Sequence, residues 1–277
     1  MRAVELAAVA RLDAGEVLRS RWLWLCLLVY GALAGVFVLV GLRESSVLGF
    51  TGVGRVLFSL CHALVLLLPL LALLATVQAV NRARDDGSLE LFLSQPIGRG
   101  AFLAGVTAVR LAALVLPLVA VMGGFAVAAV VQGHAVPWSF LARAVAVCAA
   151  LLAAYVGVGL AVSVSVRNPA RAMTLVFLVW MASVALLDFA GIALLLQWRL
   201  PPHAVFALAA ANPVQAARLA LLSAAEPTLA TLGPVGFYLA NRIGTGALLA
   251  LGLGWPLAVG ALAWGLGWAR FRRGDLI

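Results

Sequence analysis

Lysine is missing from this sequence of 277 residues, so all 19 of its Lys and Arg residues are arginine. A phosphate-binding loop of the G-x-x-x-x-G-K-[ST] type needs its lysine, and Schiff-base catalysis needs one too. No arrangement of nucleophile, base and acid stands out in the sequence. We therefore expect this chain to have no catalytic residue and no bound cofactor, and not to be an enzyme on its own.

Charged residues are also scarce, at 10% of the sequence against about 25% in ordinary soluble domains. Hydrophobic residues make up 65%, and the mean hydropathy is +1.13. A soluble fold of this size needs more polar groups to cover its surface, so the composition predicts an integral membrane protein. The net charge of +9 does not indicate nucleic acid here, because the arginines lie between long apolar runs.

Only three cysteines occur, at Cys26, Cys61 and Cys148, and all lie in apolar runs. Their odd number and wide spacing predict no disulfide framework, and we interpret them as small buried hydrophobic residues. His62 follows Cys61, but adjacent positions on a helix point about 100° apart. Because no C-x-x-C or H-x-x-H pair is present either, we expect no metal site in the chain.

Six segments are long and apolar enough for bilayer-spanning helices, which need about 20 residues each. They are residues 22–42, 56–80, 101–131, 144–166, 172–198 and 245–269. The predicted fold is therefore an all-α integral membrane protein of six transmembrane helices, forming a single domain over residues 1–277.

The arginines predict the orientation, because basic residues gather on the cytoplasmic side. Twelve lie on the side of the N-terminus: Arg2, Arg11, Arg19, Arg21, Arg82, Arg84, Arg99, Arg167, Arg171, Arg270, Arg272 and Arg273. Five lie on the other side: Arg43, Arg55, Arg199, Arg218 and Arg242. We therefore expect both termini to be cytoplasmic.

The first residues before the apolar run are open to two interpretations. Ala32-Leu33-Ala34 resembles the cleavage site of a signal peptide, but Glu5, Asp13 and Glu16 precede it, and signal peptides have short basic leaders. We favour a moderately amphipathic helix over residues 2–18 that lies on the inner membrane face.

The inner loop 81–100 reads NRARDDGSLELFLSQPIGRG. Asp85 and Asp86 suit the start of a helix, and Leu89, Phe92 and Leu93 form an apolar stripe along it. A helix this short is unstable alone in water and needs a surface to dock on. Without further information, a connector resting on the membrane is the alternative interpretation.

The stretch Asp85-Asp86-Gly87-Ser88-Leu89-Glu90-Leu91, followed by Pro96-Ile97-Gly98-Arg99, resembles a signature of ABC-2 type permeases. That signature reads acidic-Gly-Thr-Leu-Glu…Pro-x-x-Arg. Four residues before the glycine, where the family often has glutamate, this chain has Ala83. The layout of spans and termini is similar over the whole chain. The resemblance is closest to the branch named for multicopper enzyme maturation, whose type member serves nitrous oxide reductase assembly.

The resemblance implies that this loop is a coupling helix seated in a separate ATPase subunit, which holds ATP and Mg. The residues expected to couple are Asp85, Asp86, Gly87, Leu89, Glu90, Phe92, Leu93, Pro96 and Arg99. It also implies that the chain lies in the inner membrane of a bacterium. Its further partners are then a second copy of the permease, the membrane lipids and a periplasmic maturation protein.

The outer segment 199–244 is too apolar for a free loop. Asn212-Pro213 is typical of a helix start, with Asn as cap and Pro at the first position, and Glu226-Pro227 marks its end. We expect an outer hairpin or helix pair, partly embedded. It either caps the bundle as a structural lid or docks a periplasmic protein.

Asp188 is the single acid deep within a predicted span, where charge is costly and often functional. It is expected to bind a substrate cation or relay protons, or else to form an ion pair with Arg110 or Arg143.

Together these features favour the permease subunit of an ABC transporter, which couples ATP hydrolysis elsewhere to transport or to work on a periplasmic partner. Within that class, the alternative is an exporter of a lipid, peptide or drug. Outside it, the alternatives are a proton-coupled secondary transporter using Asp188 and an assembly factor without energy input. The sequence does not identify a substrate.

Overall fold

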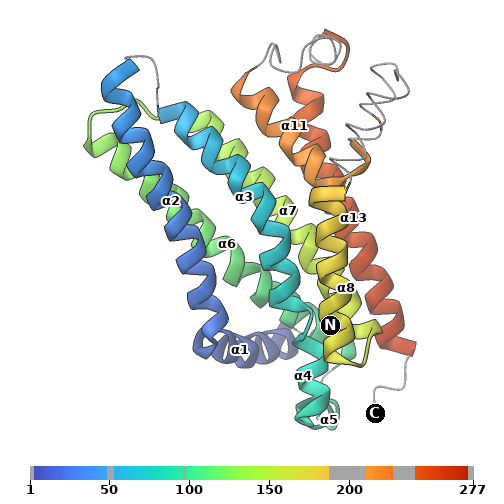
Figure 1. Ribbon diagram of the computed structural model, residues 1–277. Coiled ribbons are helices and arrows are strands. Elements are labelled where there is room, and N and C mark those ends of the chain that lie inside the picture. The colour runs from blue at the N-terminus through green and yellow to red at the C-terminus, as the bar shows by residue number, and fades with distance from the viewer. Residues whose placement is uncertain are drawn as a thin grey trace.

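Long helices lying side by side form the body of the molecule, and a short helical arm projects from one end of it (Figure 1). The computed structural model describes residues 3–48, 53–95, 98–186, 207, 210–226 and 241–273. Its main elements are α1 (Ala3–Arg19), α2 (Arg21–Leu48), α3 (Val53–Thr76), α4 (Ala79–Asp85), α5 (Ser88–Leu93), α6 (Arg99–Val131), α7 (Trp138–Ser165), α8 (Pro169–Met181), the π-helix η1 (Ala182–Leu186), α11 (Pro213–Ala225) and α13 (Thr245–Arg273).

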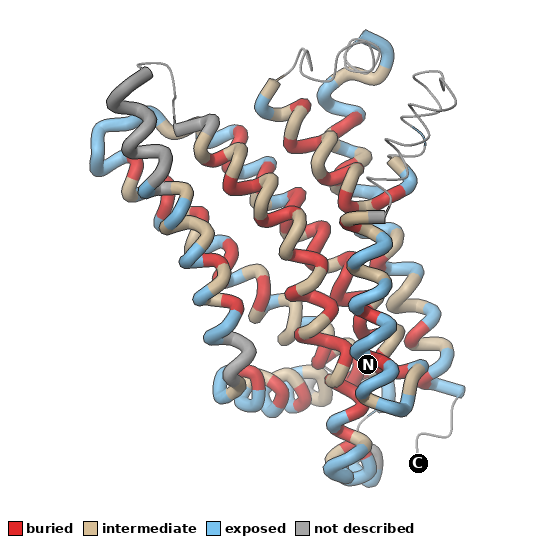
Figure 2. The backbone as a smooth tube through the Cα atoms, in the orientation of Figure 1, coloured by how far each residue is buried: buried red, intermediate tan, exposed pale blue. Residues whose placement is uncertain are grey.

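Helix α7 is the centre of the packing, since it contacts α3, α6, α11 and α13. Figure 2 shows buried residues concentrated along α3 and α7, whereas much of α2 and α8 is exposed. Where α7 crosses α13, a Cβ added to Gly260 would lie 2.7 Å from the Cα of Ala154. Such close approach of two backbones is typical of transmembrane helix pairs, in which small residues form the interface.

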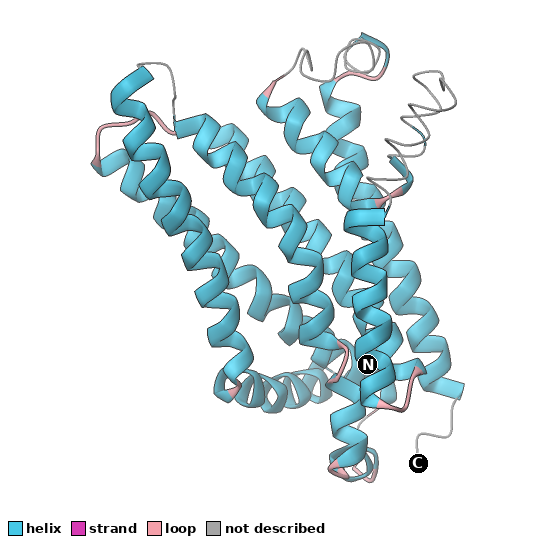
Figure 3. Cartoon of the chain, in the orientation of Figure 1, coloured by secondary structure: helices cyan, strands magenta, loops and turns pink. Residues whose placement is uncertain are grey.

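The elements assigned in the described residues are all helical, as the composition predicts, and no strand is among them (Figure 3). Four helices there are long and apolar enough to cross a membrane: Val56–Asp85, Arg99–Val131, Trp138–Ser165 and Thr245–Arg273. A pair of helices bent by 61°, Glu5–Arg19 and Trp24–Phe37, passes the same test only when the two are taken together, and it counts as a fifth if the pair is one span. The predicted span 172–198 begins as the shorter apolar helix Pro169–Ala185, and its remainder lies outside the described residues.

Helix α1 agrees with the predicted helix over residues 2–18 and lies across the end of the bundle (Figure 1). Its contact with α6 is close, because a Cβ added to Gly105 would lie 2.8 Å from Cγ1 of Val9. Val9 and Asp13, four residues apart on α1, are both buried. This explains the moderate amphipathicity of the segment, because the side of α1 that faces α6 contains both an apolar and an acidic residue.

The predicted span 56–80 is interrupted: α3 ends at Thr76, and α4 begins at Ala79. The Thr76 hydroxyl donates to the carbonyl of Ala72 at 2.7 Å, a type of contact that often bends helices. Gly159 of α7 faces this hydroxyl and has no side chain to obstruct it. The helical path then continues to Asp85, beyond the predicted end of the span.

Helix α11 begins and ends where the sequence predicts, with Asn212 as N-cap and Glu226 as C-cap. The Asn212 side chain accepts a hydrogen bond from the amide of Val214 at 3.0 Å. The helix contacts α3, α7 and α13, so it belongs to the packed bundle rather than to a free loop. The second part of the expected hairpin, residues 227–240, lies outside the described residues.

Candidate functional site

Helix α4 is the base of the projecting arm and is fastened to the end of α7. The amide of Val80 donates to Ser163 Oγ at 3.0 Å, and Nη2 of Arg84 donates to the carbonyl of Val164 at 3.2 Å. Ala79, Val80, Asn81 and Ala83 are buried. Because both polar and apolar contacts hold it, α4 forms a fixed extension of the bundle.

A glycine turn joins α4 to α5. Gly87 has φ of +72°, in the left-handed region that glycine adopts without steric cost. The amide of Ser88, one of the open amides at the start of α5, donates to Oδ1 of Asp86 at 3.0 Å. Hydrogen bonds from Ser88 hold the pKa of Asp86 below its usual value. The Asp-Gly-Ser part of the motif therefore has a local structural role, which is to reverse the chain into α5.

The apolar side of α5, for which we expected a partner surface, packs against the chain itself through Leu89 and Phe92. Leu89 is only 2% exposed and belongs to the main hydrophobic core. The Phe92 ring lies 5.6 Å from that of Phe102 in α6, which stacks on Phe271 of α13 at 5.9 Å. A helix of six residues is not stable alone, so its apolar side serves to anchor it. The side chain of Leu93 lies outside the described residues.

The opposite side of α5 and the turn before it are exposed. We call this surface the acidic tip, and it consists of Asp85, Asp86, Glu90 and Leu91. Leu91 is 67% exposed, and three exposed carboxylates lie within six residues of it in the sequence. The stripe predicted from the sequence omitted Leu91, although a leucine two positions after the buried Leu89 must point to another side of the helix.

Arg99, which the resemblance places among the coupling residues, makes hydrogen bonds within the chain. Its Nη1 donates to the carbonyl of Arg272 at 3.0 Å and to that of Phe271 at 3.5 Å, at the end of α13. The carbonyls of a last helical turn lack partners within the helix, so Arg99 satisfies them. Nearby, Glu5 of α1 accepts a hydrogen bond from the amide of Gly98 at 3.4 Å. The ends of α1, α6 and α13 thus meet at the base of the arm.

Two other predicted site residues, Pro96 and Asp188, lie outside the described residues. One alternative for Asp188 was an ion pair with Arg110. The structure gives Arg110 another partner, since its Nη2 lies 3.1 Å from Oδ1 of Asp13 in α1. Sequence reasoning missed this pair because its members are 97 residues apart and only the packing of α1 on α6 brings them together.

The cysteines have the structural role that their spacing predicts. Cys26, Cys61 and Cys148 are all free and buried. Within the described part of the chain, no cluster of three or more His, Cys, Asp or Glu residues is arranged to hold a metal ion.

These features define a class: a multi-pass helical membrane protein with a short anchored arm that presents an acidic tip. Residues 7–276 match the family model described as "ABC-2 family transporter protein". The chain therefore belongs to the ABC-2 family of transporter proteins, as the signature in residues 85–99 predicts.

Two relatives are similar over most of their length. Both are named "Probable ABC transporter permease protein NosY". The protein from Stutzerimonas stutzeri is 30% identical over 233 residues, which cover 81% of this chain and 84% of that protein. The protein from Pseudomonas aeruginosa is 31% identical over 272 residues, which cover 96% of this chain and 97% of that protein.

Proposed function

We propose that this chain is the transmembrane subunit of an ATP-driven transporter and that its acidic tip receives movement from a separate ATPase subunit. One observation supports this above all: α5 is anchored on one side by Leu89 and Phe92, and its other side is exposed. A rigidly held helix with a free surface can transmit force, whereas a loosely attached loop absorbs it. Membership of the ABC-2 family supports the same assignment.

The chemistry of the acidic tip predicts the surface that binds it. Leu91 needs an apolar socket, and Asp85, Asp86 and Glu90 favour basic side chains around that socket. A single exposed leucine is ordinary on a protein surface, but here it lies on a helix that the bundle holds outward. ATP and Mg belong to the partner, because this chain has no lysine for a phosphate loop.

The assembly that follows contains two copies of this chain and two ATPase subunits in the inner membrane of a bacterium. Six spans per chain, both termini in the cytoplasm and the arm on the cytoplasmic side agree with the distribution of arginines. Helix α8 exposes several large apolar side chains, which suit contact with lipid or with the second copy: Met173, Leu175, Phe177, Leu178 and Met181.

The output of the cycle is movement at the periplasmic end, where it acts on a maturation protein for a copper enzyme such as nitrous oxide reductase. The two relatives named NosY support this choice within the class. Helix α11 lies at the end of the bundle opposite the arm (Figure 1) and packs directly on α7, to which α4 is bonded. A displacement of the arm is therefore transmitted to that end through α4, α7 and α11, which contact one another in that order.

The exchange Leu91→Asp tests the coupling assignment. Burying a leucine contributes roughly 1.5–3 kcal/mol, so its loss should weaken capture of the ATPase about 10- to 100-fold. The measurement is pull-down of the co-expressed ATPase by purified permease, with thermal melting of the permease alone as the check on folding. Gln95→Asp, also exposed and four residues further on, is the control and should behave as wild type. Capture by Leu91→Asp at wild-type affinity would refute the role of the acidic tip.

A further inference from the structure

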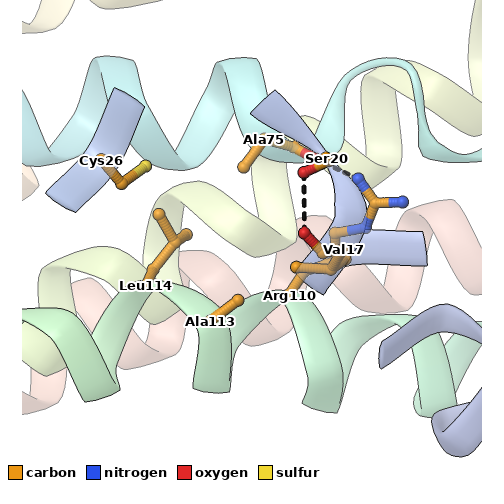
Figure 4. A pocket seen from close by; sticks show the side chains of 7 residues that line it. All are labelled: Val17, Ser20, Cys26, Ala75, Arg110, Ala113 and Leu114. Carbon is orange, nitrogen blue, oxygen red and sulfur yellow. Dashed lines mark hydrogen bonds between the residues drawn. The ribbon is translucent and has the colours of Figure 1, made fainter. Parts of the chain in front are cut away.

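Arg110 is the one charged side chain of α6 after its first residue, and it joins three helices. Its side chain is 15% exposed. Nη1 donates to the carbonyl of Ala75 in α3 at 2.7 Å, and Nη2 lies 3.1 Å from Oδ1 of Asp13 in α1. Figure 4 shows the guanidinium reaching toward Ala75 from α6. Glu16 is more distant, at 3.9 Å, and its side chain is 60% exposed.

The carbonyl that Arg110 binds lies next to the break between α3 and α4. In an unbroken helix, the carbonyl of Ala75 would accept from the amide of Ala79, and the amide of Val80 would donate to Thr76. Instead, Arg110 binds the carbonyl of Ala75, and Ser163 of α7 accepts from Val80. Leaving such groups without partners inside a membrane protein costs several kcal/mol each, so these two side chains stabilise the break.

Asp13 extends this joint to α1. Its side chain is 8% exposed, and Val9, one turn earlier, packs tightly against Gly105 of α6. At the other end of α1, the amide and hydroxyl of Ser20 bond to the carbonyl of Val17, where the chain bends into α2. The guanidinium of Arg110 thus connects the α3–α4 break to α1, and the end of α1 adjoins the start of α2.

The space beside Arg110 is too small for a substrate. The cavity there is about 10 Å³, room for about one water molecule, and is lined mainly by apolar side chains such as Cys26, Ala113 and Leu114 (Figure 4). A binding site for a transported molecule needs hundreds of Å³. The half-buried arginine is therefore better explained by the helices that it connects than by a ligand.

We propose that Arg110 and Asp13 are positioning residues that make α1 move together with the α4–α5 arm during the ATPase cycle. The inference rests on the proposed function, because the ATPase supplies the movement. Arg110 holds the α3–α4 break, and Asp13 ties α1 to the same guanidinium. The alternative is a static brace, which stabilises the fold and has no effect on how α1 follows the arm.

The exchange Asp13→Asn separates these two roles. It keeps the shape of the side chain and the bond between Arg110 and Ala75. It weakens the attachment of α1, because a neutral amide oxygen binds the guanidinium less strongly than a carboxylate does. Spin labels are placed at Leu12→Cys on α1, 58% exposed, and Gln95→Cys just after α5, also exposed. The three native cysteines are buried, so the introduced ones react selectively. The complex with the ATPase is then measured in lipid nanodiscs, with and without trapped ATP.

In otherwise wild-type protein the distance between the labels should stay the same in both states. In Asp13→Asn it should shift by about 1–5 Å when ATP is trapped, the range of known helix displacements. Glu16→Gln should behave as wild type, and Asp13→Glu should restore the constant distance. A changing distance in the wild type, or a constant one in Asp13→Asn, would overturn the proposal.

A static brace predicts a lower melting temperature for Asp13→Asn with no change in how the distances respond to ATP. Failure of the wild-type chain to capture the ATPase is a separate result, since it refutes the proposed function itself. The pull-down is therefore done first, on the same labelled preparation.

Discussion

Two asparagines have the same local sequence but different surroundings. Asn168-Pro169 begins α8 and Asn212-Pro213 begins α11, and each asparagine side chain caps its helix by accepting an amide hydrogen bond. Asn168 is exposed, whereas Asn212 is 2% exposed and also donates from Nδ2 to the carbonyl of Ser183 in the π-helix. The second bond links α11 to the π-helix η1. A capping bond alone would satisfy only an amide at the start of α11 itself.

Replacing each asparagine with alanine should therefore have unequal effects. Asn168→Ala loses an exposed cap, which costs about 1 kcal/mol of stability. Asn212→Ala loses the cap and leaves the half-buried carbonyl of Ser183 without its Asn212 donor, which adds about 1 kcal/mol. Thermal melting in detergent should show a clearly larger fall for Asn212→Ala. Equal decreases in melting temperature for the two variants would show that the hydrogen bond to Ser183 contributes no net stability.

At the scale of elements, small residues determine how closely α7 and α13 pack. Gly260 of α13 lies directly against the backbone of Ala153 and Ala154 in α7. Gly254, less than two turns earlier on the same helix, has no heavy atom within 4 Å of where a Cβ would lie. The same residue type thus has an interface role at one position and none at the other.

The exchange of each glycine for alanine should affect stability differently at the two positions. In a helix, alanine is favoured over glycine by about 1 kcal/mol, so Gly254→Ala should leave the melting temperature unchanged or raise it. At Gly260 the added methyl forces the helices apart, and overpacking of this kind costs about 1–3 kcal/mol. Gly260→Ala should therefore melt at a lower temperature. A stabilised Gly260→Ala would mean that the helices are less closely packed than described.

At the scale of the whole molecule, the proposed function assigns ATP hydrolysis and the resulting movement to different chains. All 19 basic residues are arginine, so the chain lacks the lysine with which phosphate loops bind ATP. On the arm, Leu91 and the carboxylates are exposed and Leu89 is buried, and we propose that this exposed surface receives the movement.

The purified chain should accordingly hydrolyse ATP no faster than a buffer blank. Adding back the ATPase subunit should restore turnover, and release of phosphate by each preparation measures both. Turnover by the single chain that survives repeated purification and scales with its concentration would contradict this prediction.

The sequence determined the features that depend on composition and on nearest neighbours. Its apolar content required helices in a membrane, because backbone groups in lipid must bond within their own segment. Asn212-Pro213 set the start of α11, and Gly87 set the turn before α5, since capping and left-handed conformation are local properties. The signature in residues 85–99 likewise predicted the family, which the match over residues 7–276 confirms.

Only the tertiary structure decided which partner each side of a helix contacts. The sequence located the apolar stripe of α5, but only the positions of Phe102 and Phe271 show that this side faces the chain's own bundle. Likewise, the sequence named Arg110 only as one candidate partner of Asp188, and its partner Asp13 is evident only from the packing of α1 on α6. Contacts between residues far apart in the chain depend on how helices pack, and a stripe of apolar residues specifies a contact without specifying its partner.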